Sequence, residues 1–168
     1  MSFKSELLLW DKKSTGFILS LYKNYKGNDN FLDELLVNLN EVQLQVGSTW
    51  LIKKMVEDGV SLSSQQTQLL FSNIGEFDHW ETKLHFLQIL SFLIIPPDKK
   101  VSLFDFLREG IRSDKKFVRA WSYSGLIDLA DQFPAYRSDM EAYIKIAMSE
   151  ESASVKARIR RRTSSSKN

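Results

Sequence analysis

The sequence predicts an all-α protein, and two observations carry this prediction. Apolar residues recur at the spacing of amphipathic helices along nearly the whole chain, and no convincing alternating strand pattern interrupts them. Residues that end helices fall between these segments: Gly27 and Gly59 suit a left-handed position after a helix, and Pro96, Pro97 and Pro134 stop its continuation. Ten helices are therefore expected, at residues 3–12, 15–26, 31–40, 44–58, 62–74, 79–95, 99–112, 115–132, 138–149 and 152–161.

Local signals support several of these elements in turn. The stretches "NDNFLD" and "DHWE" place Asn or Asp three residues ahead of an acid, which is typical of a helix start. The apolar run from Phe86 to Ile95 is shorter than the ~20 residues that span a bilayer, so a buried helix is expected there. The run from Leu7 to Trp10 is too short for a secretory signal. We therefore expect no membrane contact and a cytoplasmic location.

Composition sets further limits. A chain of 168 residues fits one domain, expected at 1–160, and it contains no cysteine for disulfides, thiolate metal sites or a cysteine nucleophile. The net charge of +2 is unevenly distributed: residues 151–168 carry +5, and the rest of the chain −3. Because "TSSSKN" offers nothing to bury, residues 161–168 are expected to form a disordered basic and serine-rich tail.

A repeat runs through the helical pattern. The segment "TKLHFLQIL" at Thr82 aligns with "VRAWSYSGL" at Val118 and "VKARIRRRT" at Val155, at offsets of 36 and 37 residues, and a weaker copy begins 36 residues before Thr82, at Val46. An acid lies four residues before the last three starts and a base one residue after them. The acids are Asp78, Asp114 and Glu151, and the bases are Lys83, Arg119 and Lys156.

The residues "SDKKFVRAWSYSGLIDLA", 113–130, resemble the second-helix pattern of the HEAT family of helical repeats, which is related to the armadillo family. The residues "SEESASVKARI" look like the start of a further copy, and the similarity covers roughly residues 30–160. The resemblance implies a right-handed α-solenoid of about four to five antiparallel helix pairs. It also implies that the repeated acids and bases form a structural ladder between adjacent repeats.

The sequence offers no anchor for catalysis. No phosphate-binding glycine loop and no "GxSxG" elbow occurs, and His79 and His85 fall on different faces of one helix. Asp128 and Asp131 are neighbours on a helix without a third ligand, so a solvated face is expected, and Trp121 is expected to pack in the core. We accordingly expect no catalytic residue, metal or cofactor.

The expected function is that of a non-enzymatic binding or scaffolding module, which engages another protein or a peptide through the concave surface of the solenoid. Its candidate binding residues are Lys53, Lys54, Lys83, Arg119, Arg158, Arg160, Arg161 and Arg162. Two alternatives stay open. The chain could bind nucleic acid through its basic face and tail, in the manner of HEAT-like DNA-repair glycosylases, or it could serve only assembly by end-to-end stacking. The sequence leaves the oligomeric state and the partner's identity undecided.

Overall fold

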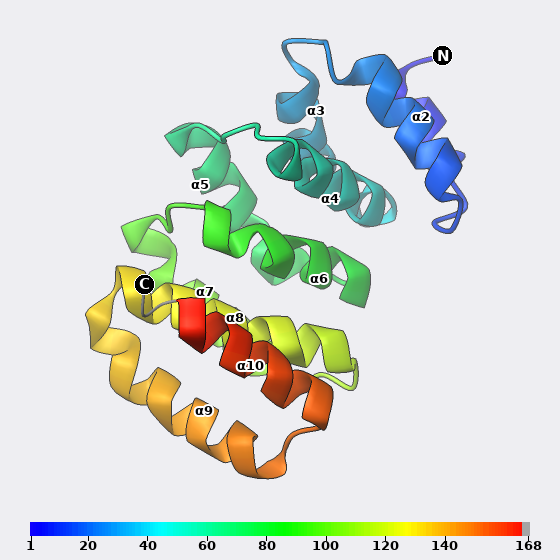
Figure 1. The fold of residues 1–168 in the computed structure, drawn as a ribbon. Helices are drawn as coiled ribbons and strands as arrows, with labels where there is room; N and C mark the ends of the chain where they lie inside the picture. Colours follow the sequence, from blue (N-terminus) through cyan, green and yellow to red (C-terminus); the bar gives the residue numbers. More distant parts are fainter. Residues whose placement is uncertain (166–168) are drawn as a thin grey trace. The chain divides into compact units, whose positions relative to one another are not determined.

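The computed structural model describes residues 1–165 and confirms the all-α class (Figure 1). Helix makes up 77% of it, and the described residues contain ten α-helices and no strand. The chain forms two compact units, of which the first is Met1–Ile89 and the second begins at Leu90. The prediction of a single domain over 1–160 stays a prediction.

Unit 1 is organised around one long central helix, α4. Its helices are α1 (Phe3–Leu8), α2 (Thr15–Tyr25), α3 (Phe31–Asn38), α4 (Val42–Glu57), α5 (Ser64–Ser72) and α6 (Trp80–Ile89). Helix α4 packs against α1, α2, α3 and α6, and it buries both apolar and small polar residues along its length. Gly47 admits the side chain of Leu7, which approaches where a β-carbon would otherwise stand. After α4, Gly59 has a φ of +95°, as expected at that helix end, whereas Gly27 does not take up a left-handed conformation.

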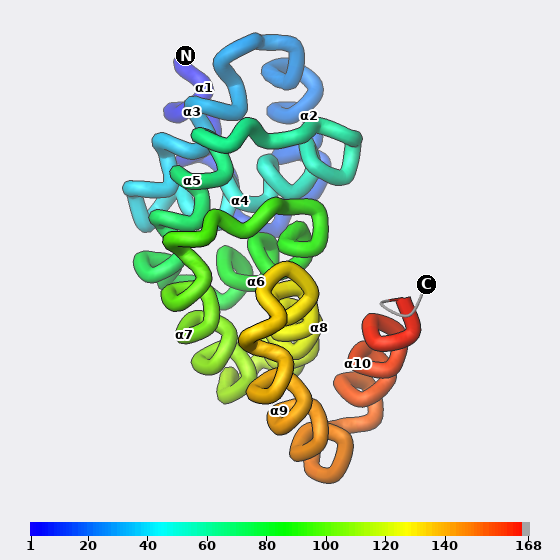
Figure 2. Tube along the Cα trace, turned by 90° about the vertical axis from the view of Figure 1, so that its left-hand side faces the viewer, coloured from blue at the N-terminus to red at the C-terminus, as the bar shows by residue number. Residues whose placement is uncertain are grey.

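Unit 2 is organised in the same way around α8. Its helices are α7 (Lys100–Gly110), α8 (Lys116–Gln132), α9 (Arg137–Glu150) and α10 (Ala153–Ser165), and α7, α9 and α10 all pack against α8 (Figures 1 and 2). Two glycines permit close packing of α7 and α8: Gly110 lies against Ser122, and Gly125 lies against Leu107. Figure 2 shows α9 and α10 diverging from the hairpin that joins them.

The helix expected at 79–95 ends early. Helix α6 stops at Ile89, a 3-10 turn covers Leu90–Phe92, and Leu93 to Ile95 are not helical. Pro96 disfavours a helical conformation at the residue before it, and Gln132 supplies the missing hydrogen bonds by accepting from the Ile95 N–H at 2.8 Å and donating to the Leu93 carbonyl at 2.9 Å. Ile94 is consequently 84% exposed instead of buried. Within the described part of the chain, no helix has the length and apolarity needed to cross a bilayer.

The last helix, in contrast, extends further than expected. Helix α10 runs to Ser165, so residues 161–165 are helical rather than disordered, and residues 166–168 lie outside the described part. The hydroxyls of Thr163, Ser164 and Ser165 each donate to the carbonyl four residues earlier, at 2.8 to 3.1 Å. These bonds keep the serine-rich end compatible with the helix.

Candidate binding surface

Most polar contacts between distant residues in both units join partners at similar sequence separations, with the Tyr25–Glu6 hydrogen bond, at 19 residues, as an exception. In unit 1, Tyr22 bonds Asp58, Thr49 bonds His85, and Gln45 bonds both Glu76 and Asp78. In unit 2, the corresponding pairs are Ile95 with Gln132, Arg108 with Tyr143, Arg119 with Glu151, Ser124 with Arg158, and Asp128 with Arg162. The partners in these contacts lie 31 to 37 residues apart, close to the sequence offset of 36 to 37.

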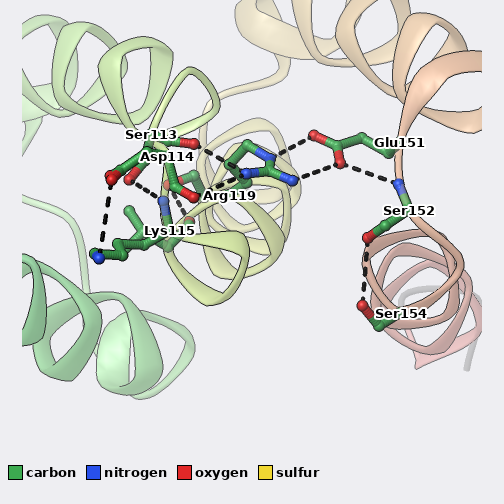
Figure 3. Close-up of polar contacts among 9 residues, drawn as sticks. Ser113, Asp114, Lys115, Arg119, Glu151, Ser152 and Ser154 are labelled. Carbon is green, nitrogen blue, oxygen red and sulfur yellow. Dashed lines mark hydrogen bonds and ion pairs between the residues drawn. The ribbon is translucent and has the colours of Figure 1, made fainter.

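One contact joins the base of one sequence copy to the acid of the next (Figure 3). The Arg119 guanidinium on α8 donates to both carboxylate oxygens of Glu151, from Nε at 2.9 Å and from Nη2 at 3.3 Å. Its Nη1 also donates to the Ser113 carbonyl at 3.0 Å, which ties the loop before α8 to the same side chain. Arg119 therefore holds the turn before α8 and the turn before α10 together.

The other residues expected in the ladder are placed differently. Asp78 is exposed, and its backbone N–H, not its carboxylate, is bound by Gln45 at 3.3 Å. Asp114 is exposed and lies 3.8 Å from Lys115. Lys83 and Lys156 are half-buried on α6 and α10. Beyond the Arg119–Glu151 pair, the ladder stays a prediction.

The two candidate lysines of α4 are paired along their own helix. Lys53 lies 2.7 Å from Glu57 and Lys54 2.5 Å from Asp58, both four residues further on. Lys54 also lies over the Tyr22 ring, whose hydroxyl donates to Asp58, and burial together with this carboxylate raises the pKa of Tyr22 to about 12. A partner would have to displace these carboxylates before it could bind either lysine.

Two of the four C-terminal arginines fix α10 to α8. The Arg158 guanidinium carbon lies 3.4 Å from the centroid of the Trp121 ring, and its Nε donates to Ser124 Oγ at 3.1 Å. Trp121 is only half-buried, so the prediction that it packs in the core is wrong. Its ring instead forms the flat surface on which the Arg158 guanidinium stacks.

Arg162 makes the second attachment. Its Nε donates to Asp128 Oδ1 at 2.9 Å, and its Nη2 donates to Asp131 Oδ2 at 2.9 Å. Asp128 is only 5% exposed, which contradicts the solvated face expected for this pair of carboxylates. Burial raises the pKa of Asp128, and the hydrogen bond from Arg162 offsets part of that rise. The buried carboxylate therefore depends on Arg162 for its compensation.

Arg160 and Arg161, unlike Arg158 and Arg162, do not face α8. Both are exposed on the side of α10 that faces away from Val155 and Ile159, its two buried residues. Together with Ala157, Ser164 and Ser165 they line a shallow depression of about 490 Å³. In the described part of the chain, neither guanidinium has an acidic partner within ion-pair distance.

A second hollow, with a volume of about 410 Å³, is lined by residues of α8 and α9 and by Thr163 of α10. Ile127, Met140 and Ile144 form its apolar lining. Its charged residues are of both signs, namely Asp131, Arg137, Glu141 and Lys145. This mixture favours no particular charge in a ligand.

Comparison with known proteins yields no match: no family model, no curated protein and no solved structure is significantly similar to the chain. Among the described residues, no group of three or more histidine or acidic side chains is arranged to hold a metal ion.

The sequence analysis did not predict several residues that form polar contacts. Gln45 is buried and bonds the Leu39 and Glu76 carbonyls as well as the Asp78 N–H, and Thr49 Oγ1 lies 3.0 Å from His85 Nδ1. The repeat offset could have indicated the second pair, since Thr49 and His85 lie 36 residues apart. It could equally have paired Trp121 with Arg158, at an offset of 37.

Proposed function

We propose that this chain is a non-enzymatic binding or scaffolding module, built of HEAT-like helical repeats, that engages another protein. The single observation that supports this proposal best is the regular separation of the polar contacts. Their partners lie 31 to 37 residues apart, and in a repeat array each unit contacts mainly its sequence neighbours, so contacts recur at about one repeat length. Such arrays act mostly as extended binding surfaces.

The surface for the partner is best sought on α10. Three of the candidate residues already form ion pairs with carboxylates, namely Lys53, Lys54 and Arg119. A ligand that bound them would have to break these ion pairs first. Arg160 and Arg161 carry no such cost, because they are exposed and no acidic side chain among residues 1–165 lies within ion-pair distance of them. Of the candidate residues, these two are the most readily available for contact.

Nucleic acid is the second candidate ligand, and the composition of α10 is the observation that favours it. This helix carries five bases and no acid. It stays second because α9, the neighbouring helix, exposes three acids, Asp139, Glu141 and Glu150, beside its two bases, so the positive charge of α10 does not continue over it. A duplex, with one charge per roughly 1.7 Å, favours surfaces whose bases spread over a whole face.

The test begins with cross-linking in the source cells, followed by reconstitution of the full chain with each purified candidate partner. We expect a stoichiometric complex with a protein, measured by sedimentation at physiological salt. We also expect duplex DNA to bind weakly and to lose roughly 10- to 40-fold in affinity between about 50 and 200 mM salt, as two or three phosphate contacts predict. Tight DNA binding at the higher salt, with no protein complex, would overturn the proposal.

A further inference from the structure

The outward side of α10 has a fixed position and carries two guanidinium groups that form no ion pair with the residues that the structure describes. Val155 and Ile159 are buried, Arg158 stacks on Trp121, and Arg162 binds Asp128. These attachments use one side of the helix only. The rotation of α10 about its axis is thereby set, so Arg160 and Arg161 face outward.

Residues around the two arginines allow a partner to approach closely. Ala157 precedes them by about one turn, and Ser164 and Ser165 follow by one turn, so all five positions share a strip along the helix. The serine hydroxyls already donate to the carbonyls of Arg160 and Arg161. The serine hydroxyl donors are already used, and the small side chains leave space above the helix. The two guanidinium groups are therefore the donors of this strip that can bind a ligand.

The chemistry of this strip selects an anionic ligand with planar, two-oxygen groups. A guanidinium presents paired N–H donors that match a carboxylate bidentately. The depression is lined by two arginines and no acid, whereas the hollow lined by α8, α9 and Thr163 carries charges of both signs. The charge is also confined to a strip about two turns long, which fits a short acidic peptide segment better than the long charged backbone of a duplex.

We propose that the outer face of α10, formed by Arg160 and Arg161 with Ala157, Ser164 and Ser165, is the docking surface for a glutamate- or aspartate-rich segment of a partner protein. This inference rests on the proposed function as a protein-binding module. The carboxylates of the partner pair with the two exposed guanidinium groups. Arg158 and Arg162 position the helix and do not contact the partner.

The test uses the full chain and a fluorescein-labelled peptide of about 15 residues, mostly glutamate, followed by anisotropy at roughly 50 and 200 mM salt. Arg160→Glu/Arg161→Glu is compared with Arg112→Glu/Lys116→Glu. The second pair is also exposed in unit 2 and changes the net charge by the same amount, but it lies outside α10. Arg160→Lys/Arg161→Lys keeps the charge and removes the bidentate geometry.

We expect the α10 charge reversal to weaken peptide binding at least tenfold, the control reversal to change it less than threefold, and the lysine variant to fall between them. Circular dichroism should show unchanged helix content in all three variants, because the substituted side chains are exposed. Equal loss in both charge reversals would overturn the inference, since net charge and not the α10 face would then set the affinity.

Two further outcomes separate this inference from the proposed function. If the wild-type chain leaves the peptide unbound, or if the reconstituted protein complex persists in Arg160→Glu/Arg161→Glu, the docking surface lies elsewhere and only the inference fails. If labelled duplex DNA binds more tightly than the peptide at the higher salt and no protein complex forms, both fail.

Discussion

The two units have the same kind of helix packing but differ in the polar groups that connect their helices. Each surrounds one long central helix, α4 or α8, with shorter ones. In unit 1 the buried polar contacts are made by neutral groups: the Gln45 amide binds three backbone groups, and Thr49 contacts His85, whereas its Lys4–Glu41 ion pair is more exposed. Unit 2 uses charged groups, with Arg119 on Glu151 and Arg162 on Asp128.

This difference has a consequence for function. In unit 2, the two arginines that attach α10 lie in the same short segment as two exposed arginines. In α10 the residues that face inward and those that face outward are adjacent in sequence, because four arginines occupy five consecutive positions. The guanidinium groups that fix this helix in unit 2 are thus of the same kind as those that its outward side exposes.

The largest expected effect is the loss of a charged contact in unit 2. Asp128→Ala removes the buried carboxylate that the half-buried Arg162 binds, so we expect the free energy of unfolding to fall by about 2–4 kcal/mol. Asp131→Ala is the matched control and should cost less than about 1 kcal/mol. Urea denaturation of both variants measures this difference, and an equal cost would refute the assigned importance of Asp128.

A smaller, pH-dependent effect is expected in unit 1. Burial, together with the charge of Lys53, lowers the pKa of His85 from 6.5 to about 4. Between these values the unfolded chain binds a proton that the folded chain excludes, so stability is lost as the pH falls from 6.5 toward 4, by up to about 3 kcal/mol.

The check for this effect compares pH profiles of two histidine variants. His85→Gln should flatten the decline of unfolding free energy in this range, whereas His79→Gln should change it only slightly, because His79 is exposed and its charge lowers the pKa of His85 less than burial does. If both variants retain the wild-type slope, the protonation of His85 does not govern the acid sensitivity of unit 1.

Much of the helical map could be predicted from sequence, because apolar spacing and end signals are local properties. Helix α8 was expected at 115–132 and is found at Lys116–Gln132. The wrongly predicted helix end depends on hydrogen-bond partners that lie far away in the sequence. Nothing local to Leu93 and Ile95 indicates that Gln132 binds their backbone.

The candidate site was harder to predict, since the sequence shows charges but not their partners. The four C-terminal arginines look alike in sequence. Trp121 and Asp128, more than 30 residues upstream, decide that Arg158 and Arg162 face inward. Applying the repeat offset to individual side chains, and not only to the helical pattern, would have pointed to these pairs.

We infer that Arg158 and Arg162 hold α10 in place, whereas Arg160 and Arg161 do not. Hydrogen exchange of the full chain, read by mass spectrometry on peptides from α10, tests it most directly. In Arg158→Ala/Arg162→Ala we predict at least tenfold faster exchange in α10, equivalent to about 1.4 kcal/mol of local stability, with exchange in α4 unchanged. In Arg160→Ala/Arg161→Ala we predict exchange in α10 close to that of the wild type. Equal acceleration in the two variants, or none in the first, would contradict the account.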